Sequence, residues 1–320
     1  MMQAEPALQW SEPVTQFVGF VSLFLANGAI GFRYGAMRRR FSTADPRHEA
    51  AQLFYEAAAQ RAAWLGLIGA LVQAALLVTQ LPHQAERMHL STGQLLTTDP
   101  QTIARCVLLL AALAGLALAA GRRWAGWPAA AVGLIGTQLS VVLSGRWAGL
   151  VNPVHQLLAS LWLGTLAVMV IAGIGPVLRG PSNLRGPIVA DMVNGFSPLA
   201  LICGPLLVVT GVITALMHLH PFASLWTTAY GYALLTKLCL VAVVFGLGAW
   251  NWRRQRPRLG SEEAAGLIRR SSVMELTVAT LVLVVTSVLV SLPSPRPPQG
   301  AGQAAGVAGA VTGGTVVAPR

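Results

Sequence analysis

Charged residues are scarce in this sequence, and acidic residues are the scarcest of them. Only 10% of the 320 residues are Asp, Glu, Lys or Arg, and 11 residues are acidic. Hydrophobic residues make up 54% of the chain, and the mean hydropathy is +0.61. With so few charges the chain lacks the surface of a water-soluble protein, so the composition excludes an ordinary soluble domain.

Several motifs that would define other protein classes are also missing. The three cysteines lie in apolar stretches without CxxC spacing, which argues against a disulfide framework or a zinc site. No glycine-rich phosphate loop ending in Gly-Lys-Ser or Gly-Lys-Thr is present, so we expect no direct nucleotide-driven step. Glu5 and Glu12 stand where a signal peptide carries positive charge, and we therefore expect no cleaved signal peptide.

What the sequence does contain is a series of long apolar stretches. We identify eight that are long enough to cross a hydrocarbon layer of about 30 Å. We therefore predict an all-α integral membrane protein built as a bundle of eight transmembrane helices. The predicted spans are residues 14–36, 62–80, 103–120, 126–144, 153–178, 196–217, 232–251 and 272–292.

The spans divide the chain into four parts. Residues 1–13 are expected to be an external segment, 14–151 contain spans 1–4, 152–293 contain spans 5–8, and 294–320 form a tail. The tail consists mainly of Pro, Gly, Ala and Val with few charges, so it cannot bury a core. We predict that it is disordered and external.

The basic residues are distributed unevenly between the two sides of the predicted bundle. Fifteen arginines fall on the side reached after spans 1, 3, 5 and 7, and five fall on the other side. Because cytoplasmic loops are enriched in Lys and Arg, this bias places both termini outside the cytoplasm. The net charge of +11 therefore reflects membrane topology, and we expect no nucleic-acid partner.

Histidine is concentrated on the predicted outer side, where five of the six residues fall. Two methionines directly adjoin these histidines. Imidazole and thioether groups together suit copper, especially Cu(I), better than Mg²⁺ or Ca²⁺. We predict that outward-facing ligands capture a copper ion, although histidines that only mark the membrane interface would give the same pattern. The candidate ligands are His155, His218, His220, Met217, His83, His89 and Met88.

Three further side chains are candidates for a pathway or a structural polar role. Lys237 lies about 9 Å inside the seventh span, at helical rise, where a charge is costly unless it meets water or a partner. Glu275 lies near the opposite end of the eighth span, so we do not pair it with Lys237. Trp162 follows His155 by two helical turns on the same face and is expected to pack.

The second half of the chain resembles the copper resistance D (CopD) family of bacterial inner-membrane proteins. The resemblance covers roughly residues 152–293, and spans 1–4 match only in number and hydropathy. It rests on Val154-His155, Trp162-Leu163-Gly164, Phe196-Ser197-Pro198, Thr210-Gly211, Tyr230-Gly231 with Lys237, Asn251, Arg270 with Glu275, and Leu292-Pro293.

The resemblance implies a multi-pass protein of the bacterial cytoplasmic (inner) membrane that handles copper. Members are usually described as moving copper inward, often with a periplasmic copper-binding CopC-type partner. This chain departs from that pattern, since its tail is too plain to be a CopC-type domain and it has no methionine-rich or CxC motif. The expected partners are the lipid bilayer and a CopC-type protein.

We therefore expect copper transport or copper delivery, without enzyme activity. Two alternatives remain from other classes. Histidines on adjacent spans can be axial ligands of haem, which would make the chain an electron-transfer membrane protein. The other alternative is a structural or assembly subunit, for which the sequence offers only glycine-rich helix faces suited to packing.

Overall fold

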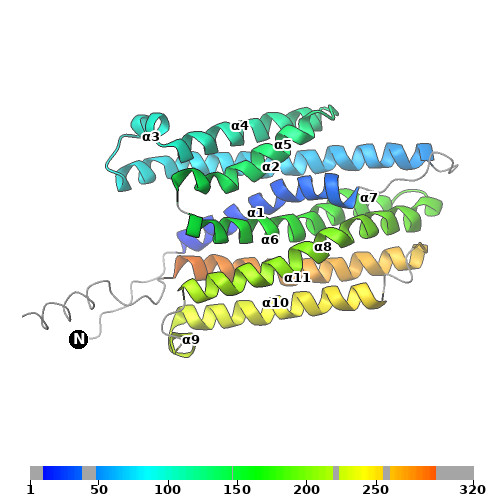
Figure 1. Cartoon of the computed structure of the whole chain (residues 1–320). Coiled ribbons are helices and arrows are strands. Elements are labelled where there is room, and N and C mark those ends of the chain that lie inside the picture. The colour runs from blue at the N-terminus through cyan, green and yellow to red at the C-terminus, as the bar shows by residue number, and fades with distance from the viewer. Residues whose placement is uncertain (1–9, 38–47, 146, 219–222, 255–259, 293–320) are drawn as a thin grey trace, which may run out of the picture.

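Long helices that run side by side form the whole described part of the chain (Figure 1). The computed structural model describes residues 10–37, 48–145, 147–218, 223–254 and 260–292. No strand occurs in these ranges, and eight of their helices are long and apolar enough to cross a membrane. The predicted all-α class with eight spans is confirmed.

The first four spans come from the N-terminal half. The first is an α-helix that continues as a π-helix, and the fourth ends in 3-10 turns. The elements are α1 (Ser11–Gly31), η1 (Phe32–Ala36), α2 (His48–Arg87), α3 (Thr92–Thr98), α4 (Pro100–Ala120), α5 (Gly126–Leu139), η2 (Ser140–Ser144) and η3 (Trp147–Leu150).

The last four spans come from the C-terminal half. The fifth also contains a π-helical segment. The elements are α6 (Val151–Val168), η4 (Met169–Ile174), α7 (Gly175–Val177), α8 (Ser182–His218), α9 (Ser224–Thr227), α10 (Ala229–Arg254) and α11 (Glu262–Ser291).

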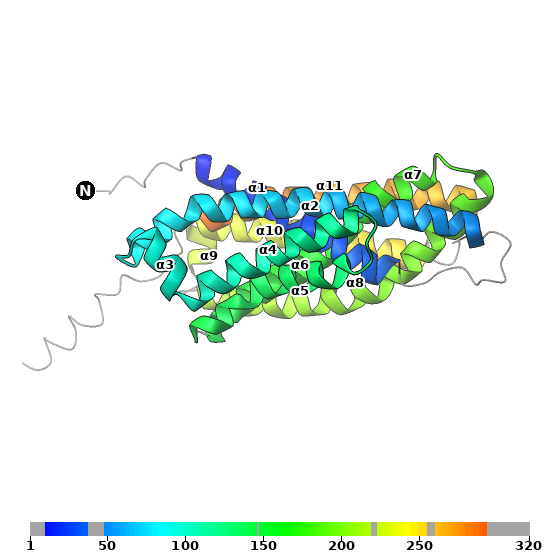
Figure 2. The ribbon, with the colours of Figure 1, turned by 90° about the horizontal axis from the view of Figure 1, so that it is seen from above.

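The two ends of the bundle carry different connections. The α4–α5 turn, α7 and the first turns of α8 and α11 lie at one end, here called the α7 end (Figures 1 and 2). The opposite end, the α3 end, carries α3 and α9 together with the starts of α6 and α10. The start of α1 and the end of α11 share the α3 end, as eight alternating spans require. Which end faces the cytoplasm stays a prediction.

Three helices are longer than predicted. Helix α2 starts at His48 and continues to Arg87, so it extends beyond the predicted span 62–80 at both ends. Helix α8 starts at Ser182 and α11 at Glu262, each at least ten residues before its predicted span. Hydropathy detects only the part of a helix inside the lipid, whereas polar turns extend beyond it.

The ends of two helices show why they begin where they do. Asp99 caps α4, since its Oδ2 accepts the backbone N–H of Thr102 at 2.9 Å and Pro100 follows in the first turn. Ser261 caps α11 in the same way, with two glutamates in the first turn, and the sequence signal for it was missed.

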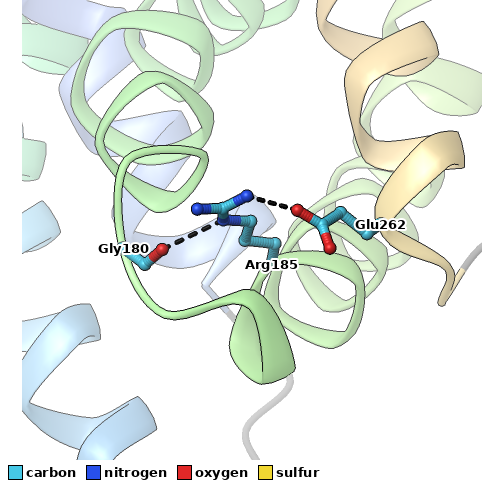
Figure 3. Close-up of polar contacts among 3 residues, drawn as sticks. All are labelled: Gly180, Arg185 and Glu262. Atoms are coloured by element: carbon cyan, nitrogen blue, oxygen red, sulfur yellow. Dashed lines mark hydrogen bonds and ion pairs between the residues drawn. The ribbon is translucent and has the colours of Figure 1, made fainter.

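A polar clamp holds the starts of α8 and α11 together at the α7 end (Figure 3). Arg185 forms an ion pair with Glu262 and donates from Nε to the carbonyl of Gly180 at 3.0 Å. The clamp lies where the helices extend beyond the predicted spans.

Helix α1 crosses α6 with almost no side chain between the backbones. A Cβ added at Gly164 would lie 2.2 Å from the carbonyl oxygen of Phe24, so only glycine fits there. One residue before Gly28, the fully buried Asn27 donates from Nδ2 to Ser160 Oγ at 2.8 Å. Small residues and one interhelical hydrogen bond therefore fix the first span against the fifth.

The predicted terminal segments are largely not described. Residues 10–13 begin α1, while the rest of 1–13 and all of 294–320 lie outside the described residues. The predicted external location and the disorder of the tail stay predictions.

Candidate functional site

Polar side chains from two membrane helices meet near the α3 end of the bundle. His155 lies in the second turn of α6, Thr210 lies two turns before the end of α8, and the two are joined by a contact of 2.9 Å between Nδ1 and Oγ1. Lys237 on α10 lies close enough for its charge to act on the same ring. Sequence reasoning singled out His155 and Lys237 separately, and the structure places both in the parts of α6 and α10 near the α3 end.

The hydrogen bonds of Thr210 assign the proton on the imidazole. A hydroxyl has one proton, and Thr210 Oγ1 lies 2.8 Å from the carbonyl oxygen of Leu206, one turn earlier on α8. That proton goes to the carbonyl, because a carbonyl can only accept. Oγ1 can therefore accept an N–H from His155 Nδ1, and the neutral tautomer protonated at Nδ1 carries its lone pair on Nε2.

This arrangement is the one that prepares a histidine to bind a metal ion. Metal-binding imidazoles commonly donate their second ring N–H to a neighbouring acceptor, which fixes the ring and its tautomer. Gly211 makes room for the ring, since a Cβ there would lie 3.2 Å from His155 Cε1. The pair Thr210-Gly211 thus positions His155 from the opposite helix.

An apolar layer lies below this group, toward the α7 end. Trp162 is buried, and its ring centroid lies 5.0 Å from that of Phe245 on α10. Cys203 and Leu207 of α8 and Val282 of α11 belong to the same buried cluster. Trp162 is therefore a packing residue between four spans, as expected, and it separates His155 from the α7 end.

Glu275 and Asn251 form a second polar pair beyond the apolar layer. Glu275 on α11 is only 8% exposed, and its carboxylate accepts a hydrogen bond from Asn251 Nδ2 on α10. Asn251 follows Lys237 by 14 residues, about 21 Å along the helix. Glu275 and Lys237 therefore lie at different depths, as predicted from the sequence.

The other candidate ligands lie apart from His155 or are not described. His83 is exposed on α2, with Nδ1 3.9 Å from Glu86 Oε2, and Met88 and His89 are exposed in the turn before α3. Met217 is exposed at the end of α8. His218 ends α8 with its side chain undescribed, and His220 lies outside the described residues.

No multi-ligand metal site is assembled within the described ranges. They contain no group of three or more His, Cys, Asp and Glu side chains placed to hold a metal ion. The seven predicted ligands therefore stay a prediction. Among them, His155 is the one whose ring contacts a polar side chain of a neighbouring helix, Thr210. The roles of Thr210 and Asn251 were missed, although both residues carried the family resemblance.

Comparisons with known proteins agree with this part of the chain. The family model of copper resistance protein D matches residues 190–289, which include Thr210, Lys237, Asn251 and Glu275. The chain contains a copper resistance D region. This CopD region covers α10 and most of α8 and α11, whereas His155 and spans 1–4 lie outside the match.

A second comparison finds a relative with a copper-related name. "Copper transport protein CutJ" of Bacillus subtilis (strain 168) is 32% identical over 152 residues, which is 47% of this chain. The match covers 26% of the length of that relative. There is no significant match among solved structures. Both sequence comparisons support the resemblance to the copper resistance D family that was predicted from the sequence.

Proposed function

We propose that this chain transports or delivers copper across the bacterial cytoplasmic membrane, with His155 as a capture ligand. The observation that carries the proposal is the contact between His155 Nδ1 and Thr210, because a ring that donates from Nδ1 to this hydroxyl has its lone pair on Nε2 for a metal ion. The CopD region and the copper transport relative support copper as the substrate. The chain acts as a carrier and performs no chemical reaction on its substrate.

Lys237 tunes how long the ion stays. The charged form of Lys237 would repel a cation bound to His155, so the site would bind more weakly than the same histidine alone. Transport requires binding strong enough for capture and weak enough for release. In this proposal Lys237 makes binding weak enough for release.

The route continues through the CopD region toward Glu275 and Asn251. The Trp162 cluster closes the route in the described conformation, so the four helices must shift for an ion to pass. The arginine bias orients the α3 end outward, toward the periplasm. A CopC-type protein would then deliver copper to the exposed His83, Met88, His89 and Met217 side chains at that end.

The test is copper accumulation by cells that express the protein. His155→Ala should reduce cell-associated copper, measured by elemental analysis, toward that of cells with empty vector. His48→Ala, at the predicted cytoplasmic end of α2, is the matched control and should leave accumulation unchanged. Normal accumulation by His155→Ala at equal protein level would overturn the proposal.

An absorption spectrum separates copper handling from the haem alternative. The purified protein is expected to show no Soret band, and copper should bind to wild type more tightly than to His155→Ala. A Soret band that disappears in His155→Ala would instead assign this histidine to haem.

A further inference from the structure

A second site lies at the opposite end of the bundle, outside the CopD region. A cavity of about 470 Å³ opens between η1, α2, α4 and α5, near the α4–α5 turn. Its volume is in the range of small-molecule sites. Residues of the first four spans line it, and none of them takes part in the copper site described above.

Two arginines dominate the charge of the cavity wall. Arg33 and Arg122 line it with a single acidic residue, the exposed Glu56, so the wall carries a net positive charge. Arg122 donates from Nε to Gln60 Oε1 at 3.1 Å, and Gln60 donates to the carbonyl of Ala120 at 3.0 Å. These bonds fix the Arg122 guanidinium against α2 while it keeps further N–H donors on its fork.

The backbone of Arg122 adopts a conformation that favours glycine. Arg122 has φ 65°, in the left-handed region that favours glycine. It closes the end of α4 through its N–H to Ala119, and the next N–H bonds to Leu118 at 2.9 Å. Glycine stands one position earlier, so the chain places arginine where the smaller residue is preferred.

Two tryptophans mark the membrane boundary at the same cavity. Trp124 is 77% exposed and Trp127 is buried, and both line the cavity. Indole rings favour the headgroup level of a bilayer, where one part of the ring is apolar and the other meets water. The arginines therefore lie at the depth of lipid phosphates.

We propose that this cavity binds the headgroup of an anionic phospholipid in the leaflet at the α7 end. Guanidinium groups bind phosphate oxygens through paired N–H donors, and basic pockets between membrane helices accept anionic headgroups. The arginine bias makes this the cytoplasmic leaflet. The site does not depend on copper transport.

Native mass spectrometry of the detergent-purified full chain with added phosphatidylglycerol tests the proposal. Arg122→Gly removes the guanidinium and suits the positive φ, so the variant should unfold at the same temperature as wild type or higher. Its affinity for phosphatidylglycerol should fall about tenfold, as expected for a lost charged hydrogen bond. The matched control is Arg123→Gly, which removes an equal charge from the same turn outside the cavity lining.

Three results would overturn the proposal. Wild type that retains no phosphatidylglycerol would remove the site. Equal losses in Arg122→Gly and Arg123→Gly would reduce it to general charge attraction. Competition by millimolar inorganic phosphate as effective as that by the lipid would make it a site for a soluble anion.

Discussion

At the scale of single residues, the threonine opposite His155 decides what the histidine can do. The sequence identified the histidine, because an imidazole in a membrane span is unusual. It did not identify the role of Thr210, since the direction of a hydroxyl proton depends on a carbonyl one turn away and on the approach of another helix. Such a detail appears only when the helices are packed.

The first prediction concerns this hydroxyl. Thr210→Val keeps the shape of the side chain but removes the acceptor for Nδ1, so copper affinity should fall about 10-fold or more. Thr236→Val is the control, because that exposed hydroxyl bonds only to its own helix at Tyr232. Copper titration of purified protein measures both, and equal affinities of wild type and Thr210→Val would contradict the role assigned to the hydroxyl.

The second prediction concerns the buried carboxylate beyond the apolar layer. Asn251→Leu removes the donor to Glu275 and should destabilise the folded protein by about 1–3 kcal/mol. Glu275→Gln keeps an acceptor for Asn251 and should have a smaller effect. Thermal unfolding in detergent compares the two variants. An Asn251→Leu protein as stable as wild type would show that the hydrogen bond between Asn251 and Glu275 does not stabilise the fold.

At the scale of elements, glycine rather than hydrophobicity determines which helices touch. Hydropathy located all eight spans but not their partners. The contact between α1 and α6 depends on glycines whose missing side chains let the backbones meet, and such pairs cannot be matched from one sequence. The early starts of α8 and α11 were missed for another reason, because the clamp of Arg185 and Glu262 lies in polar sequence.

The third prediction uses two glycines in different surroundings. Gly164→Ala puts a Cβ against the α1 backbone and should destabilise the protein by at least about 1–3 kcal/mol. Gly246→Ala, on α10, meets nothing within 4 Å and should be neutral or stabilising by up to about 1 kcal/mol. In the same detergent, Gly164→Ala should unfold at a lower temperature than wild type and Gly246→Ala at the same temperature or higher. Equal unfolding temperatures of the two variants would refute the close crossing.

At the scale of the whole molecule, alternating helices place His155, the proposed copper ligand, and the arginine-lined cavity at opposite ends. Hydropathy was sufficient to predict the alternation of the spans, since each span must reverse the direction of the last. What hydropathy could not predict is the cavity, which depends on four helices from the half of the chain outside the CopD region.

The fourth prediction tests the orientation of these two ends. In a variant with the native cysteines replaced, Gly93→Cys on α3 should react with an impermeant maleimide in intact cells, because nothing lies within 4 Å of a Cβ at this position. Arg123→Cys at the α4–α5 turn should react only after lysis. Labelling in the reverse order would invert the topology and place the copper ligands inside.

The hydrogen bond between Asn27 and Ser160 also has a consequence for synthesis. Its partners are separated by 133 residues, so the first span enters the membrane long before the fifth exists. At synthesis rates of roughly 5–20 residues per second, Asn27 waits roughly 7–27 s for Ser160. Throughout that time its amide must be shielded by the insertion machinery, by water or by a temporary neighbour. Helix α1 is therefore inserted early, but its hydrogen bond to α6 can form only after the fifth span has been made.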